Sequence, residues 1–288
     1  MSDTAFAPQH HDLAVNGLTL RVVTWGERAT PERAVFLVHG ITASSQYWAE
    51  IGPALARRGW YPIAIDLRGR GLSDKPPHGY GLPFHANDIL AVCDQFELTT
   101  IHYIGHSLGA LIGLYLGAVY PHRVAKLILI DAGGKLPPDA IEAITPALAR
   151  LGTIYPTLET YLEAMLSASH FSGDRAFWER YFRYDAETRP DGRVMSRVPE
   201  GAIAEEQASL FVTRTEFLPE FIKAPVLILR ATEGLLEGGR GQILPAAEAK
   251  RLRGIIPGCR VVEISGSNHY TIVLAAKFIE EVATFLAE

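Results

Sequence analysis

The sequence predicts an α/β protein whose central sheet is mostly parallel, and three observations lead to this prediction. Short, unbroken apolar runs recur along the chain, which is typical of strands covered on both faces. Helical patterns separate most of these runs, which favours parallel strands joined by helices on both faces of the sheet. Polar residues that often take part in chemistry follow the runs closely, at His39, Asp66, Ser107, Asp131 and His269. In such a sheet these positions lie at the carboxyl ends of the strands, where ligands bind.

The first predicted elements form a hairpin. Apolar and polar residues alternate over residues 13–15 and 18–22, on either side of Asn16 and Gly17. This pair suits a two-residue turn because both residues tolerate a positive φ angle. Unbroken apolar runs then predict buried strands, at residues 34–38, 62–65, 101–104, 127–130, 226–229 and 261–264.

The segment 136–217 breaks this alternation, because it contains no clear buried strand. Helical patterns predict helices in it, at residues 138–151, 158–168 and 174–184. We therefore expect a helical cap, inserted between the sixth and seventh strands of the core. The expected boundaries are 1–135 and 218–288 for the core and 136–217 for the cap.

Composition argues against several classes of partner. The chain has 288 residues, a net charge of −5 and no run of Lys and Arg, so no nucleic-acid partner is expected. The apolar helical pattern after Gly109 ends at residue 120, short of the roughly 18 residues that a membrane span needs, so no membrane partner is expected. Residues 1–12 lack the basic start and apolar stretch of a signal peptide, which makes a cytoplasmic location the default expectation.

Two cysteines, Cys93 and Cys259, are too few for a disulfide framework, so we expect reduced, buried thiols. No pattern indicates a cofactor or a metal ion, and none is predicted. The expected partner is a small-molecule substrate, and the sequence leaves the oligomeric state open.

The pentapeptide from Gly105 to Gly109, with Ser107 at its centre, lies between a β-branched run at residues 99–104 and a helical pattern at 110–120. Strand, sharp turn and helix are what a nucleophile elbow requires. The flanking glycines lack the Cβ atoms that would clash with neighbouring backbone, so Ser107 can adopt a strained conformation with its hydroxyl over the sheet edge. An ordinary connection that happens to contain serine is the alternative, and it is less favoured if a base and an acid are available.

A serine hydroxyl needs a base, and His269 is best placed, after the last predicted strand and before a C-terminal helix. His10 and His11 lie in a terminus that we expect to be mobile. Asp131, at the end of the sixth strand, is the favoured acid because that strand lies beside the one that leads to Ser107. The alternative acids, Glu233 and Glu237, follow the seventh strand, as the acid usually does in this layout, but Gly234 stands where an Asp would be expected. Asp131 could instead only cap the turn that follows it.

An oxyanion needs donors that are already in place, and backbone N–H groups are the usual source. Leu108 supplies one directly after the nucleophile, at the start of a helix whose dipole favours negative charge. Ile41, in the loop after the third predicted strand, is expected to supply the second. His39 in the same loop is interpreted as a structural hydrogen-bonding residue.

These motifs together resemble the α/β-hydrolase family over the whole chain. His39 and Gly40, the segment 66–73, the elbow and Asn268 with His269 occur in the family's order. The resemblance implies an eight-stranded sheet, a Ser/Asp/His triad and a cap over the active site. An acid after the sixth strand is similar to a branch of the family, the hydrolases of (acetamidomethylene)succinate, but the weaker similarity in the cap argues against transferring that substrate.

Ser107 at the elbow excludes the haloalkane dehalogenases and epoxide hydrolases of this fold, which use an aspartate there. The sequence favours hydrolysis of a small carboxylic ester, lactone or activated amide through an acyl-Ser107 intermediate. A carbon–carbon bond hydrolase of ring-cleavage products stays an alternative, although Gly-Asn-Ser-Met-Gly is the commoner elbow there. A ligand receptor without turnover is the other alternative.

Two groups of side chains in the expected cap are candidates for contact with a substrate. Aromatic residues at helical spacing predict a packing face that touches a ligand only in part, at Phe177, Trp178, Tyr181 and Phe182. Arginines could bind a substrate carboxylate, although most helical arginines are solvated, and they stand at Arg150, Arg175, Arg180, Arg183 and Arg193.

Overall fold

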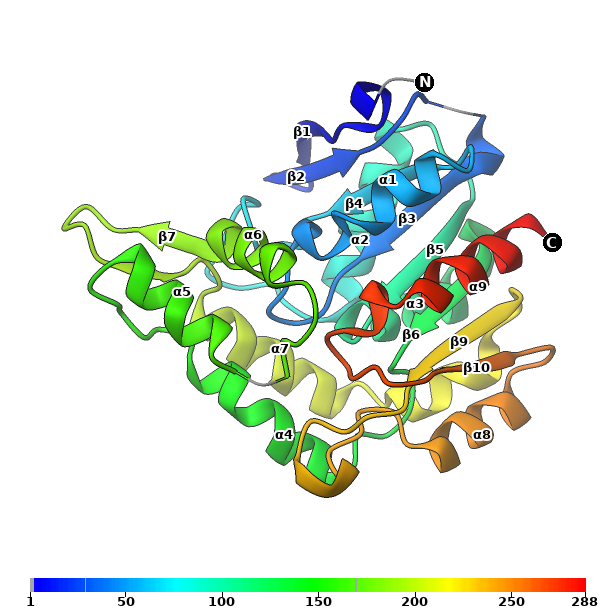
Figure 1. Ribbon diagram of the computed structural model, residues 1–288. Coiled ribbons are helices and arrows are strands. Elements are labelled where there is room, and N and C mark those ends of the chain that lie inside the picture. Colours follow the sequence, from blue (N-terminus) through cyan, green and yellow to red (C-terminus); the bar gives the residue numbers. More distant parts are fainter. Residues whose placement is uncertain (1–2, 29, 169) are drawn as a thin grey trace.

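A computed structural model describes residues 3–28, 30–168 and 170–288 of the protein (Figure 1). Met1 and Ser2, which begin the segment where no signal peptide is expected, lie outside these residues. Within the described residues, no helix has both the length and the apolar character needed to cross a membrane.

The centre of the molecule is a sheet of eight strands in the order β1-β2-β4-β3-β5-β6-β9-β10. β2 pairs antiparallel with β1 and with β4, and the other pairings are parallel. The strands are β1 (Gln9–Val15), β2 (Leu18–Thr24), β3 (Ala34–Val38), β4 (Tyr61–Ile65), β5 (Ile101–His106), β6 (Val124–Ile130), β9 (Val226–Ala231) and β10 (Arg260–Ile264). The prediction of a mostly parallel, eight-stranded sheet is confirmed.

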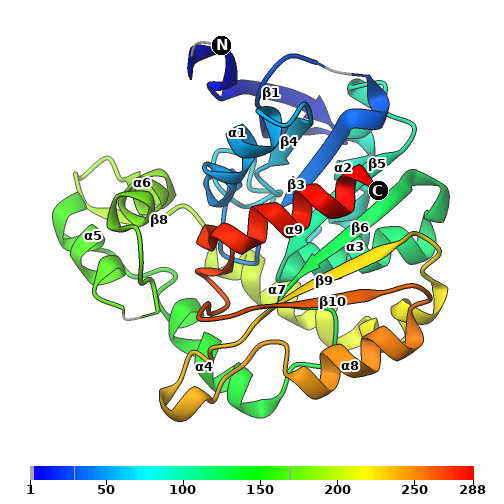
Figure 2. The same ribbon diagram turned by 45° about the vertical axis from the view of Figure 1, so that its right-hand side comes forward.

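Helices cover both faces of this sheet, as Figure 2 shows for α9 on one face. They are α1 (Ile51–Ala56), α2 (Leu82–Gln95), α3 (Leu108–Val119), α4 (Pro138–Ala149), α5 (Leu158–Leu166), α6 (Arg175–Asp185), α7 (Glu200–Val212), α8 (Ala246–Ile255) and α9 (Ala276–Ala287). Successive strand residues face opposite sides. Phe36 belongs to the buried apolar cluster that includes α2, α3 and α8, and its neighbour Leu37 to the cluster that includes α1 and α9.

The N-terminal hairpin forms as predicted. Asn16 and Gly17 have φ angles of 51° and 75°, so both turn residues adopt the left-handed region. One expectation is wrong, because His10 and His11 lie in β1 and are not part of a mobile terminus. His11 is held in place by a 2.9 Å hydrogen bond between its Nε2 and the hydroxyl of Thr24 on β2.

Within segment 136–217, helices α5 and α6 lie to one side of the core in both views (Figures 1 and 2). The helices α4, α5 and α6 lie where the patterns predict them. Helix α7 and a small antiparallel pair, β7 (Ala186–Thr188) with β8 (Val194–Ser196), were not predicted. The reason is local: each strand of the pair has three residues, too few to show alternation, and α7 buries only Ala202, Ile203 and Glu206, so its apolar periodicity is weak.

Strand register positions the residues that follow β5 and β6. His106 pairs with Ile130, so Ser107 and Asp131 each come one residue after a matched pair of neighbouring strands. The Ser107 N–H donates to the Ile130 carbonyl at 3.2 Å, and the Asp131 N–H donates to the Leu229 carbonyl at 2.7 Å. The carboxyl ends of β5, β6 and β9 are therefore joined by hydrogen bonds at the edge where the site lies.

Candidate active site

Ser107 occupies a sharp turn between β5 and α3. Its φ and ψ angles are 56° and −118°, a strained conformation for a residue with a side chain. The glycines on either side allow this turn, because a Cβ at Gly105 would collide with the Gly109 carbonyl and a Cβ at Gly109 with the Val38 carbonyl. The local geometry is therefore that of a nucleophile elbow.

Asp131 and His269 meet although 138 residues separate them. His269 Nδ1 lies 2.9 Å from Asp131 Oδ2, and both side chains are buried. An ionised carboxylate only accepts hydrogen bonds, so Nδ1 is the donor, and in the neutral form of the ring Nε2 keeps a free lone pair. The other carboxylate oxygen, Oδ1, accepts the N–H of Ala231 at 3.0 Å, which fixes the carboxylate plane.

The alternative acids lie elsewhere. Glu233 and Glu237 are exposed. Among the carboxylates of the described residues, only that of Asp131 contacts His269. Gly234 has no room for a larger residue, since a Cβ there would collide with the Arg240 carbonyl. The loop after β9 is therefore shaped differently from one that would carry an Asp at that position.

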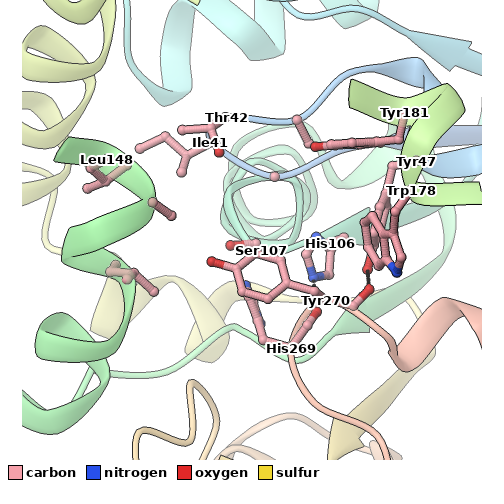
Figure 3. Close-up of a pocket in the computed structure, with 14 residues that line it drawn as sticks. Ile41, Thr42, Tyr47, His106, Ser107, Leu148, Trp178, Tyr181, His269 and Tyr270 are labelled. Atoms are coloured by element: carbon pink, nitrogen blue, oxygen red, sulfur yellow. Dashed lines mark hydrogen bonds between the residues drawn. The ribbon is translucent and has the colours of Figure 1, made fainter. Parts of the chain in front are cut away.

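Ser107 and His269 line the same pocket (Figure 3). Within the described residues, the Ser107 hydroxyl makes no hydrogen bond with the imidazole. Such contacts are often long in enzymes without substrate and shorten when the substrate is bound. The structure thus brings the three residues to one site, without a hydrogen bond between Ser107 and His269.

Ile41 follows β3 and also lines the pocket. The backbone N–H groups of Ile41 and Leu108 make no hydrogen bond within the part of the chain that is described. The loop around Ile41 is held from behind: His39 Nδ1 donates to the Gly40 carbonyl at 2.7 Å, and Arg70 Nε donates to the Ile41 carbonyl at 2.9 Å. Both carbonyls are thereby occupied.

His39 is structural. Its Nε2 accepts the N–H of Leu67 at 3.1 Å, and its side chain is fully buried. Burial lowers the pKa of His39 to about 3, so the ring is neutral at ordinary pH.

His106 and Tyr47 hold the backbone of the His269 loop. Tyr47 lies in a short 3-10 helix, η3 (Ser45–Trp48). His106 Nε2 donates to the His269 carbonyl at 2.8 Å, and the Tyr47 hydroxyl donates to the Tyr270 carbonyl at 3.0 Å. The His106 ring lies between those of Tyr47 and His269, with centroid distances of 4.5 Å to each. Burial, and to a smaller extent His269, lowers the pKa of His106 well below its usual value, so its ring is neutral.

The pocket walls are apolar and aromatic. Its volume is about 60 Å³, and its lining comprises Gly40, Ile41, Thr42, Ala43, Tyr47, His106, Ser107, Ile144, Ala147, Leu148, Trp178, Tyr181, His269 and Tyr270. The aromatic cluster of α6 is buried as predicted, and two of its members, Trp178 and Tyr181, reach the pocket. No local pattern pointed to Tyr47, Leu148 or Tyr270, because they come from segments far apart in the chain.

None of the five candidate arginines is among the residues that line this pocket in the described chain. Arg150 is partly buried and pairs with Asp185 at 3.2 Å, and Arg175 is exposed. The others form ion pairs on the surface: Arg180 with Glu50, Arg183 with Glu179 and Arg193 with Asp191. The hypothesis that one of them binds a substrate carboxylate in this pocket is not supported.

Both cysteines are free and buried, as predicted. Burial raises the pKa of Cys93 to about 12 and that of Cys259 to about 11, so both are protonated thiols. Within the described residues, no group of three or more His, Cys, Asp and Glu side chains is arranged to hold a metal ion.

A family model described as the alpha/beta hydrolase fold matches residues 33–276. The chain belongs to the α/β-hydrolase family. This α/β hydrolase is 28% identical over 235 residues to 2-(acetamidomethylene)succinate hydrolase of Mesorhizobium japonicum. The aligned residues cover 81% of this chain and 80% of the relative.

Solved structures agree on the fold of this α/β hydrolase. The crystal structure of E-2-(acetamidomethylene)succinate hydrolase has a TM-score of 0.83 at 23% identity, and the match covers 98% of this chain and 100% of the other. An α/β hydrolase from Novosphingobium aromaticivorans has a TM-score of 0.78 at 23% identity, with 98% of each chain covered. The resemblance that the motifs predict, to the family and to this branch, is confirmed.

Proposed function

We propose that this α/β hydrolase is a serine-dependent enzyme that cleaves a small carboxylic ester, lactone or activated amide. Ser107 is the proposed nucleophile, His269 the base and Asp131 the residue that orients His269. The observation that carries this proposal is the hydrogen bond between His269 Nδ1 and Asp131, which in the neutral imidazole leaves Nε2 as the proton acceptor at a pocket that also contains Ser107.

The proposed reaction has two halves. His269 Nε2 takes the Ser107 proton as Oγ bonds to the substrate carbonyl carbon, and the N–H groups of Ile41 and Leu108 hold the oxyanion. The carbonyl re-forms, the bond to the leaving group breaks, and His269 passes its proton to that group. A water molecule then gives a proton to His269 and bonds to the acyl carbon, and the carboxylic acid leaves as Ser107 recovers its proton.

Segment 136–217 acts in this proposal as a cap. Its α4 supplies Ile144, Ala147 and Leu148 to the pocket, and its α6 supplies Trp178 and Tyr181. Water is thereby limited around the developing oxyanion, which strengthens hydrogen bonds to it. The cytoplasmic location stays a prediction, and no cofactor is needed for the chemistry proposed.

The substrate of the relative named above is a succinate, and we do not carry it over to this chain. A succinate presents carboxylates, and the lining of this pocket holds no arginine or lysine. What transfers is the reaction class, hydrolysis, for which the relatives of this chain are named.

The proposal is tested by the release of 4-nitrophenol from 4-nitrophenyl acetate. We expect an initial burst equal to the enzyme concentration or steady turnover, and Ser107→Ala should lower kcat by about 10³-fold or more. The exposed Ser167, changed to Ala, is the matched control and should keep the wild-type rate. Equal rates for Ser107→Ala and wild type would refute the nucleophile. Binding without turnover across esters, lactones and amides would favour a receptor instead.

A further inference from the structure

We infer that the pocket accepts an uncharged, short, apolar acyl group and rejects acyl groups that carry a carboxylate. This inference rests on the proposed function and names the substrate class of the same site. It follows from the apolar side chains of the two pocket walls, from the charged groups near the pocket and from the small pocket volume of about 60 Å³.

The first wall consists of aliphatic side chains. Ile144, Ala147 and Leu148 share one face of α4, because they stand at positions i, i+3 and i+4. Leu148 lies across from Ile41 in the loop after β3 (Figure 3). These side chains offer a carboxylate no hydrogen bond. An apolar chain buried against them gains roughly 0.8 kcal/mol for each methylene group.

The second wall consists of aromatic rings, and two of their polar atoms are already hydrogen-bonded. The Tyr47 hydroxyl donates to the Tyr270 carbonyl, and Trp178 Nε1 donates to the Ser172 carbonyl at 3.1 Å. Tyr181 and Tyr270 are neutral, because burial raises the pKa of each hydroxyl. The second wall therefore offers apolar ring surface and a few uncharged hydroxyls.

Charges near the pocket oppose an anion. Arg150, a partly buried cation of the cap, is paired with Asp185, which also accepts a hydrogen bond from Tyr161. Asp131 is ionised in the proposed mechanism and lies directly behind His269. A substrate carboxylate in this pocket would lose its hydration, gain no cationic partner and lie near a like charge.

The test compares two ethyl esters of the same shape. Monoethyl succinate and ethyl 4-methylpentanoate differ in whether a carboxylate or an isopropyl group ends the same short acyl chain. With proton release as the assay at pH 7.5, we expect kcat/KM to be at least about 100-fold higher for the neutral ester. Equal or higher kcat/KM for monoethyl succinate would overturn the inference.

A binding measurement tells a failure of this inference from a failure of the proposed function. Calorimetric titration of Ser107→Ala with each ester needs no turnover, and we expect the neutral ester to bind at least about tenfold more tightly. If this preference is found while the wild type hydrolyses neither ester, the pocket assignment holds and the proposed catalysis fails. If neither ester binds, or the anionic one binds better, the pocket assignment is wrong.

A cation introduced into the aliphatic wall should weaken the selectivity. Leu148→Arg places a guanidinium on α4 at the pocket, and we expect the preference for the neutral ester to fall by about tenfold or more. Leu148→Met is the matched control, because it changes the shape of the side chain without adding charge, and should keep the preference. An unchanged preference in Leu148→Arg, with the variant folded by circular dichroism, would count against a direct contact between α4 and the acyl group.

Discussion

Asp131 lies at a sharp backbone turn directly after β6, where its φ angle is 47°. Ser107, which follows the neighbouring strand, lies at a similar turn with a φ angle of 56°. A positive φ is uncommon for residues with side chains and marks positions that surrounding structure holds in place. Here both turns lie at the same sheet edge, and the carboxylate is bound on both oxygens, by His269 and by the Ala231 N–H.

Replacement of Asp131 by Asn should lower kcat by about 10⁴-fold in the 4-nitrophenyl ester assay, because an amide in place of the carboxylate favours the wrong tautomer of His269. Glu233→Gln is the matched control, since Glu233 is exposed and outside the pocket. The assignment of Asp131 fails if its Asn variant keeps near-normal activity while Glu233→Gln loses it.

At the scale of elements, helix α7 connects segment 136–217 to the loop that carries Ile41. Glu206 on α7 accepts hydrogen bonds from Arg70 at 3.0 Å and from His85 at 2.6 Å, and all three side chains are fully buried. Arg70 also donates to the Ile41 carbonyl. A buried carboxylate on α7 thus holds the arginine that fixes the backbone of the proposed oxyanion loop.

Truncation of this carboxylate should destabilise the protein. We expect Glu206→Ala to lower the free energy of unfolding in urea by about 3–5 kcal/mol, because Arg70 would stay buried without its counter-charge. Gln207→Ala, at the neighbouring exposed position of the same helix, should change it by about 0.5 kcal/mol or less. Similar values for the two variants would mean that the Arg70–Glu206 pair contributes little to attaching α7.

At the scale of the whole molecule, the sheet separates two buried apolar clusters, one on each face, and the cluster beneath α1 and α9 continues into α5 and α6. This shared packing attaches segment 136–217 to the core. Buried histidines lie within the same compact structure. His39 and His106 are neutral there, because burial lowers the pKa of each.

These histidines should make the protein less stable in mild acid. Above pH 6.5 both are neutral in the folded and the unfolded chain; below it, only the unfolded chain gains the protons. Each residue should therefore reduce the free energy of unfolding by about 1.4 kcal/mol per pH unit as the pH falls from about 6.5 toward its folded pKa. Urea titrations between pH 6.5 and 5.0 measure the slope.

His39→Gln is the control for that slope. An amide can accept the Leu67 N–H but does not titrate, so the slope of this variant should be smaller by about 1.4 kcal/mol per pH unit. Carboxylates contribute equally to both proteins. Identical slopes would show that His39 does not have the lowered pKa.

Much of the fold could be predicted because each strand and helix carries its own pattern. Residues 34–38 are apolar throughout since β3 is covered on both faces, and Asn16 with Gly17 specifies a turn by itself. Helix α7 shows the limit: it buries a glutamate, and a polar residue held by distant partners leaves no apolar periodicity to detect.

Residues close together in the chain were enough to predict the parallel sheet, the elbow around Ser107 and the set of candidates for the acid and the base. Contacts between distant segments show that Asp131 meets His269, that the candidate arginines of segment 136–217 are paired elsewhere or exposed, and that the pocket is apolar. The pocket is built from a β3 loop, α4, α6 and the loop after β10, and its polarity depends on which distant side chains meet there. Local patterns indicate which face of an element is buried, but they do not indicate which distant segment packs against it.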